Sequence, residues 1–162
     1  MRYLSGKEEK FALNYMNEAG SSATGSTCLR AKCGSVIAKD GEIIGRGFNS
    51  PPGGLESQRR CSCSKDEVHK KVTDKTCCMH AEQRAIMNAL QHNPNKLRDS
   101  RLYFARIDEM GKITAAGEPY CTICSKMALD VDISEFVLLK REGICVYNTE
   151  EYNELSFSYK GN

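Results

Sequence analysis

Apolar and polar positions alternate along this chain with two periods, one typical of helices and one typical of strands. Apolar residues recur every three or four positions in three segments, which are predicted to be helices: 6–19, 80–93 and 121–130. β-rich runs predict strands in four places: 34–49 (a hairpin turning at Asp40–Gly41), 101–107, 135–139 and 144–147. This order of elements predicts an α/β fold, a layered sandwich in which helices cover a mixed sheet.

Two polar segments interrupt the pattern. Residues 50–54, Ser-Pro-Pro-Gly-Gly, form a turn that neither a helix nor a central strand would accept. Residues 55–76 are charged and poorly periodic, and we interpret them as a long insert that needs a staple or a partner to become ordered. Residues 148–162 show no clear period. With no internal repeat, residues 1–162 are predicted to be a single domain that carries this insert.

The balance of charge narrows the choice of partners. The chain has 23 Lys+Arg against 21 Asp+Glu, which indicates no broad electrostatic attraction to nucleic acid or membrane. A short basic strip could still serve a single-stranded or looped nucleic acid. No stretch approaches a membrane span, and the first fifteen residues lack the apolar core of a signal peptide. We therefore expect a soluble, cytoplasmic protein without a membrane partner.

Nine cysteines are many for a chain of 162 residues. In a secreted domain they would indicate disulfides, but without a signal peptide metal binding or catalysis is the better interpretation. An odd number also leaves at least one thiol outside any scheme made of disulfides alone. The spacing of the cysteines therefore has to decide which of them are candidate ligands.

One histidine and two cysteines stand where a tetrahedral metal would need them. His80 opens one predicted helix, and Cys121 and Cys124 lie three apart at the start of another, so both sulfurs fall on one face. A helix N-terminus also favours the thiolate form that binds metal. These ligands suit a zinc ion with an open fourth position, where a water becomes a nucleophile near neutral pH. Glu82 is placed to move protons beside that water.

Each part of this group has a simpler interpretation by itself. His80 could be a core or helix-start histidine, Glu82 a first-turn carboxylate, and Cys-x-x-Cys a redox pair or half of a structural zinc knuckle. Joined in this order, with a strand between the two helices, they match H-x-E with P-C-x-x-C, the signature of zinc-dependent nucleobase deaminases. A zinc module that binds nucleotides without catalysis would keep the three ligands but would not need Glu82.

On these motifs the chain resembles the zinc-dependent cytidine and deoxycytidylate deaminase superfamily, and within it most of all the deoxycytidylate (dCMP) deaminase branch. The likeness runs from about Phe11 to Leu139. It includes "STCLRAKCGSVIAKDGEIIGRGFNSPP" at residues 26–52, which supplies the Ser-x-Cys-x-Arg and Gly-Phe-Asn elements of that branch. The resemblance implies a cytidine deaminase-like three-layer α/β/α sandwich with a mixed five-stranded sheet, and a homo-oligomer.

The resemblance also implies a role for each residue of the site. One catalytic zinc would be bound by three residues: His80, Cys121 and Cys124. Glu82 would protonate the ring nitrogen and later the leaving ammonia. Asn49 would hydrogen-bond the sugar, and the backbone N–H of Ala81 would meet the pyrimidine carbonyl. The implied reaction converts a cytosine-type base to a uracil-type base with release of ammonia, on dCMP or a related small-molecule nucleotide.

Departures from the branch leave the substrate open. Tyr120 separates Pro119 from the first cysteine of the motif, and Arg84 stands where the branch commonly has Asn. The stretch 102–119 is longer than usual, which predicts an extra loop over the site. Alternatives therefore remain: a base in RNA or single-stranded DNA, a free nucleoside, or guanine. The loop at 50–54 could also join a regulatory nucleotide site.

The cysteines outside the motif raise the question of a second, structural zinc. A poorly periodic insert is where such a staple would help. The candidate ligands are these: Cys28, Cys61, Cys63, His69, Cys77 and Cys78. The spacing Cys-x-Cys is less specific for zinc than Cys-x-x-Cys, so reduced thiols are the favoured interpretation.

Overall fold

One mixed sheet forms the centre of the computed structural model, which describes residues 1–61 and 78–159. Within those residues it has seven strands: β1 Arg2–Tyr3, β2 Lys32–Lys39, β3 Glu42–Phe48, β4 Arg101–Ile107, β5 Ile113–Thr114, β6 Glu135–Lys140 and β7 Gly143–Asn148. The strand order is β1-β7-β6-β4-β2-β3, with β5 paired to β4. β4 and β6 are parallel, and every other described pair is antiparallel.

The predicted strands are all present, and two short ones are added to them. β2, β3, β4, β6 and β7 have at least six residues each and correspond to the five strands predicted from the sequence. β1 and β5 have two residues each and extend the sheet to seven strands. The Asp40–Gly41 hairpin is also confirmed, since β2 and β3 pair on either side of it.

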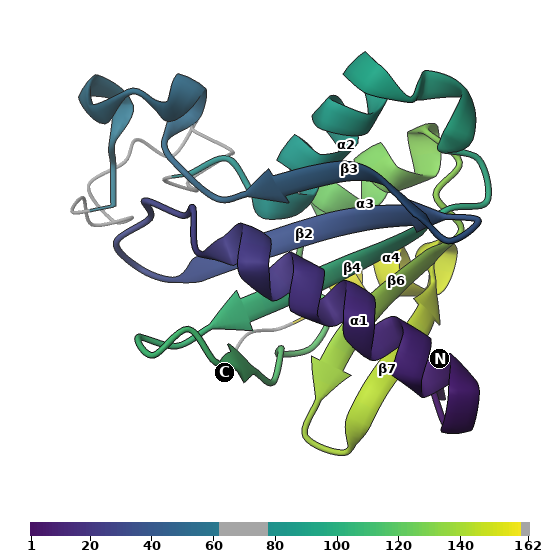
Figure 1. The fold of residues 1–162 in the computed structure, drawn as a ribbon. Coiled ribbons are helices and arrows are strands. Elements are labelled where there is room, and N and C mark those ends of the chain that lie inside the picture. The colour runs from purple at the N-terminus through teal and green to yellow at the C-terminus, as the bar shows by residue number, and fades with distance from the viewer. Residues whose placement is uncertain (62–77, 160–162) are drawn as a thin grey trace.

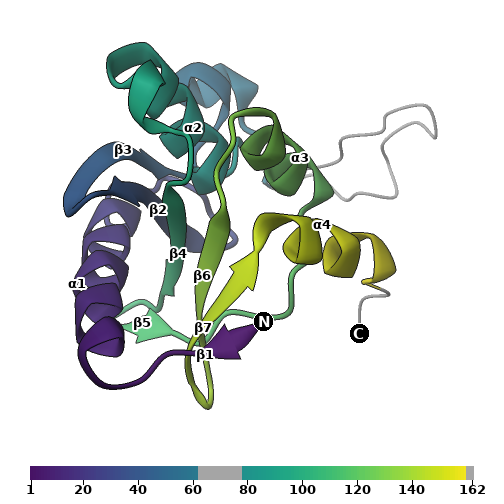
Figure 2. The ribbon, with the colours of Figure 1, turned by 90° about the vertical axis from the view of Figure 1, so that its right-hand side faces the viewer.

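Four α-helices of the described residues cover the two faces of this sheet (Figures 1 and 2). They are α1 Gly6–Ala23, α2 Ala81–His92, α3 Thr122–Asp130 and α4 Thr149–Ser158. α1 lies on one face, and α2, α3 and α4 lie on the other, as the turned view in Figure 2 shows. The three-layer α/β/α sandwich is therefore confirmed. None of the described helices is long and apolar enough to cross a membrane.

Alternation along β4 shows how the sequence builds two cores. Leu102 and Phe104 belong to the cluster beneath α2, α3 and α4, whereas Tyr103 and Ala105 belong to the cluster beneath α1. Successive side chains of a strand point to opposite faces, so a strand covered on both sides reads as a continuous apolar run. This explains why "LYFA" carries no polar position.

α4 is the helix that the sequence pattern did not predict. It is mostly polar, and Tyr152 is its one large buried side chain, with its ring stacked on Phe136 at 4.1 Å between centroids. Its start is fixed by Asn148, whose side-chain oxygen accepts a hydrogen bond from the Glu150 N–H at 2.9 Å. One buried ring and a cap are too little to produce a helical period in the sequence.

α2 is seated on β3 at unusually short range. A Cβ added to Gly47 would lie 2.3 Å from the carbonyl oxygen of Ala81, and one added to Gly45 would lie 2.5 Å from that of Ala85. Both neighbours are backbone atoms, so they could give way only if the helix moved. These glycines therefore set the height of the first turn of α2 above the sheet.

Replacing Gly47 with alanine should push the start of α2 away from β3. We expect Gly47→Ala to lower the free energy of unfolding by about 1–3 kcal/mol, because the extra methyl group overpacks a backbone contact. Urea unfolding measures this change. Gly117→Ala is the matched control, since an added Cβ there meets nothing within 4 Å; it should stay within about 0.5 kcal/mol of the parent. Equal stability of the two variants would contradict this packing account.

Candidate functional site

The three predicted metal ligands converge where two helices begin. His80 caps the N-terminus of α2, and Cys121 caps that of α3. His80 Nδ1 lies 3.2 Å from Cys121 Sγ and 3.3 Å from Cys124 Sγ, and the two sulfurs are 2.8 Å apart. The fold thus brings together His80 and Cys121, which are 41 residues apart in the sequence.

Local hydrogen bonds hold these ligands in place. The His80 N–H donates to Gln83 Oε1 at 2.9 Å, which caps the first turn of α2. Cys121 Sγ accepts from the Cys124 N–H at 3.3 Å, and Ser125 Oγ donates to the Cys121 carbonyl at 3.2 Å. The first turn of α3 therefore orients both sulfurs toward the imidazole.

The electrostatics of the cysteine pair favour binding of a cation. The hydrogen bond with Cys124 lowers the pKa of Cys121 to about 5, and the hydrogen bond and charge of His80 act in the same direction. The same sulfur–sulfur contact, together with burial, raises the pKa of Cys124. The pair therefore carries one thiolate and one thiol without metal. A divalent cation would offset the cost of the second thiolate, and two sulfurs with one imidazole nitrogen are a ligand set that zinc accepts.

Glu82 lies beside this group and is almost completely buried, with 5% of its surface exposed. Burial raises the pKa of Glu82, while the positive charge of His80 opposes that effect. A carboxyl group that holds its proton more readily than an exposed glutamate can both accept and return a proton near neutral pH. The position of Glu82 thus suits the proton-transfer role predicted from the sequence.

A pocket of about 200 Å³ opens onto the site. Its wall includes all of the following: Cys28, Arg30, Ala31, Cys33, Asn49, Cys78, His80, Ala81, Glu82, Phe104, Arg106 and Tyr120. Both predicted substrate contacts, Asn49 and Ala81, are therefore brought to the same cavity as Glu82. Their contacts with a substrate stay predictions.

Asn49 also organises the wall in which it lies. Its side-chain oxygen accepts from Ser26 Oγ at 2.6 Å and from the Cys33 N–H at 2.8 Å. Its amide nitrogen donates to the Ala31 carbonyl at 2.9 Å. These bonds tie the end of β3 to the segment before β2, so Asn49 has a structural function whatever it contacts in a substrate.

Two residues that depart from the resembled branch have clear positions. Tyr120 lines the pocket and keeps 48% of its surface exposed, so the residue inserted before the zinc motif forms part of the pocket wall. Arg84 instead donates to the Pro51 carbonyl at 2.9 Å and anchors the loop at 50–54. The predicted extra loop over the site is not seen at the pocket. Residues 113–114 pair with β4, and no residue of 108–119 lines the pocket.

Arg30 and Arg106 line the pocket and were not singled out as site residues from the sequence. A signal for Arg106 was present, because it follows Phe104 by two positions in β4 and must share its face. The basic residues expected in the insert offer no comparison, since 62–77 lies outside the described residues. The candidate ligands Cys63, His69 and Cys77 lie outside them as well.

Comparison with known proteins gives a consistent picture. The family described as "Cytidine and deoxycytidylate deaminase zinc-binding region" matches residues 9–140. A deoxycytidylate deaminase of Schizosaccharomyces pombe is 27% identical over 78 residues, which span 46% of this chain but only 24% of that protein. The chain thus matches about a quarter of the length of this relative.

Two solved structures share the fold. The dCMP deaminase of the cyanophage S-TIM5, in complex with dCMP and dUMP, superposes with a TM-score of 0.56 at 23% identity, covering 82% of each chain. A cytidine deaminase from Burkholderia pseudomallei gives a TM-score of 0.56 at 13% identity and covers 86% of this chain and 94% of its own. At these identities the likeness concerns the arrangement of helices and strands.

The shifted pKa of Cys121 can be tested on the metal-free chain. A thiolate should form with a midpoint near pH 5, because the thiol is protonated below its pKa and ionised above it. Thiolate absorbance in the ultraviolet measures this step, which Cys121→Ser should remove. Cys33→Ser is the control, since burial raises the pKa of Cys33 to about 11 and its loss should leave the step intact. A step that survives Cys121→Ser would contradict the assignment.

Proposed function

The chain belongs to the cytidine and deoxycytidylate deaminase family, and on this basis we propose that it is a zinc-dependent hydrolytic deaminase. It converts a cytosine-type base to a uracil-type base with release of ammonia, on dCMP or a related nucleotide. The observation that supports this most directly is the meeting of His80, Cys121 and Cys124 beside buried Glu82 at one pocket.

The three ligands and Glu82 divide the work of hydrolysis. Zinc held by His80, Cys121 and Cys124 would supply Lewis acidity that makes a water molecule nucleophilic near neutral pH. The Glu82 carboxylate accepts a proton from the attacking water and passes it to the ring nitrogen next to the amine-bearing carbon. Glu82 then takes the second proton of the oxygen that attacked and gives it to the amine, so that the carbon–oxygen double bond forms as ammonia leaves.

Backbone and side-chain groups of the pocket hold the base and sugar. The N–H of Ala81 is one of the first amides of α2, which have no partner within the helix, and it is available to a pyrimidine carbonyl. Asn49 offers its amide to the sugar from a side chain already fixed by three hydrogen bonds. Tyr120 presents an aromatic ring at the pocket wall, where a base can stack on it.

Two arginines make a nucleotide a better substrate than a nucleoside. Arg30 and Arg106 line the same pocket as Glu82. A guanidinium group donates in a planar fork that matches phosphate oxygens. We assign the phosphate to these two residues. The name of the yeast relative, a deoxycytidylate deaminase, supports a monophosphate as the substrate.

Deamination of a base in RNA or single-stranded DNA is the second candidate. The exposed ring of Tyr120 and the two arginines would also suit an unpaired base and its flanking phosphates. We favour a free nucleotide because the charge of the chain is nearly balanced, with 23 Lys+Arg against 21 Asp+Glu, whereas a strand-binding surface is typically basic. A homo-oligomer, which the resemblance implies, and a cytoplasmic location, which the sequence pattern led us to expect, stay predictions.

Removing the proton-transfer group should separate metal binding from turnover. We expect Glu82→Gln to keep its zinc and to lose about 10²- to 10⁴-fold in turnover, the usual contribution of general acid–base catalysis. Ammonia release from dCMP and zinc content measure the two properties. Glu109→Gln, at an exposed turn, is the control and should behave as the parent. Unchanged turnover of Glu82→Gln would contradict the mechanism.

Removal of a guanidinium group should lower activity on nucleotides more than activity on nucleosides. We expect Arg30→Ala or Arg106→Ala to lower kcat/KM for dCMP by about 10- to 150-fold, from the roughly 1.5–3 kcal/mol of a hydrogen bond to a charged group. Activity on deoxycytidine should change little. Arg98→Ala, at a surface ion pair with Asp132, is the control.

The same assay distinguishes the two candidate functions. An equal loss on dCMP and deoxycytidine would remove the phosphate assignment. Turnover of a cytosine-containing single strand, with none of any monomer, would place the protein among the enzymes that act on nucleic acid.

A further inference from the structure

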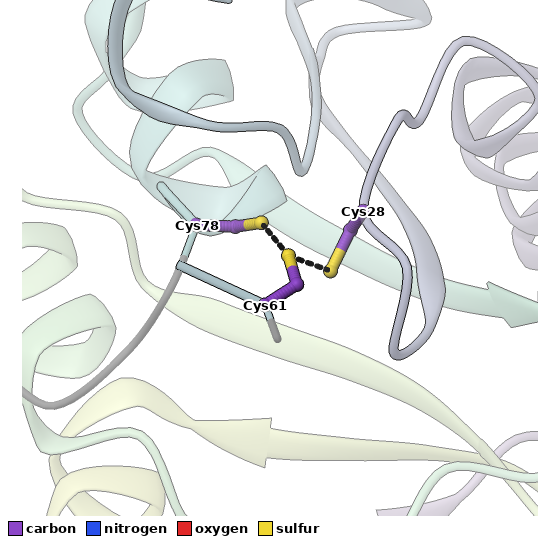
Figure 3. Close-up of side chains that lie close together, drawn as sticks. All are labelled: Cys28, Cys61 and Cys78. Atoms are coloured by element: carbon purple, nitrogen blue, oxygen red, sulfur yellow. Dashed lines mark hydrogen bonds between the residues drawn. The ribbon is translucent and has the colours of Figure 1, made fainter. Parts of the chain in front are cut away.

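A second group of buried cysteines lies close to the first and takes no part in the proposed reaction. The Sγ of Cys61 is 3.9 Å from that of Cys28 and 3.5 Å from that of Cys78. Figure 3 shows the three side chains pointing toward one another. All three sulfurs lie within 4.8 Å of one another. They come from three separate segments: the loop before β2, the start of the insert, and the residues that precede α2.

The spacing of the sulfurs fits a shared metal ion. A disulfide requires about 2.05 Å between sulfurs, and neither measured pair approaches that value. A tetrahedral zinc with Zn–S bonds of about 2.3 Å separates its sulfur ligands by about 3.8 Å. The measured distances of 3.5 and 3.9 Å lie on either side of this edge length.

The group is also distinct from the apolar core. Cys28, Cys61 and Cys78 form a buried cluster of their own, whereas the large apolar residues of the sheet and helices form two others. Cysteines that only fill space would be expected among those apolar side chains. Three thiols that form a cluster of their own indicate a different role.

Two arginine side chains contact Cys61. Arg59 Nη1 lies 3.8 Å from the Cys61 sulfur and also donates to the Thr27 carbonyl at 2.7 Å. Arg30 Nε donates to the Cys61 carbonyl at 3.1 Å. Cationic neighbours stabilise thiolate over thiol, and the thiolate is the form that binds metal. The same arginines connect Cys61 to the segment that carries Cys28.

We propose that Cys28, Cys61 and Cys78 bind a second metal ion, a thiophilic divalent cation such as zinc. The described residues supply three thiolates, and a fourth donor completes the tetrahedron. The ion joins the loop before β2 and the start of the insert to the residue two positions before His80. It is a structural ion, because none of its three ligands takes part in the proposed reaction.

This ion would fix one wall of the catalytic pocket. Cys28 and Cys78 both line that pocket, and Met79 between Cys78 and His80 donates its N–H to the Ser50 carbonyl at 3.0 Å. Tying Cys78 therefore limits the movement of His80. This consequence depends on the proposed function, whereas the metal site itself does not.

Counting zinc in full-length protein, purified under reducing conditions and loaded with zinc, tests the proposal. We expect two zinc ions per chain in the parent and one in Cys28→Ser or Cys61→Ser. Cys33→Ser is the matched control, because Cys33 is 8% exposed, as are Cys28 and Cys61, and belongs to neither group; it should keep two. Cys124→Ala should lose the other ion and keep this one.

Cobalt substitution keeps the test decisive if a variant fails to fold. The parent should bind two cobalt ions per chain, with thiolate-to-cobalt absorption from five sulfur ligands. One metal ion per chain that disappears in Cys124→Ala would overturn the proposal, as would a disulfide between Cys61 and Cys78 in the freshly purified protein. Two zinc ions in a protein that releases no ammonia would support this site and reject the proposed function.

Discussion

The close contact between α2 and β3 determines where the reactive groups of this protein lie. Because Gly47 has no side chain, β3 packs directly against the backbone of Ala81. Ala81 stands between His80 and Glu82 in the sequence. A larger residue at either contact would lift the first turn of the helix. His80 and Glu82 would then move together relative to β4 and to the helix α3, at whose start the two cysteine sulfurs lie. The site is therefore positioned by packing in the sandwich as well as by its own hydrogen bonds.

Burial gives the site its chemistry, and it also makes negative charge on the two sulfurs costly without a cation. Desolvation raises the pKa of Glu82 and opposes ionisation of the sulfurs. The Cys121–Cys124 pair settles this conflict by sharing a proton, so that one sulfur is charged and the other is neutral. Two thiolates beside a buried carboxyl group require a compensating positive charge. The arrangement that makes Glu82 suitable for proton transfer thus also favours metal binding at His80.

How much of this could be predicted from the sequence depends on how local each feature is. The helices at α1, α2 and α3 and the Asp40–Gly41 hairpin have periods or turns that are visible within a short window. α4 does not, because its burial rests mainly on Tyr152. Arg106 could have been assigned to the pocket from strand alternation once Phe104 was placed there. For His80, Cys121 and Cys124, the motif named the residues, and the structure brings them together.

The three cysteines were among the candidates taken from the sequence, but spacing could not select them from the others, because spacing describes neighbours in the chain. Cys28 and Cys61 are separated by 33 residues, and Cys61 and Cys78 by 17. The described partners of Cys61 come from two distant segments, and Cys63 lies outside the described residues. A long polar insert has little apolar surface with which to order its ends. Three thiols meeting beside Arg59 supply a local attachment there, next to the residues that begin α2. Cys28 and Cys61 are in this way brought together with Cys78, two positions before His80.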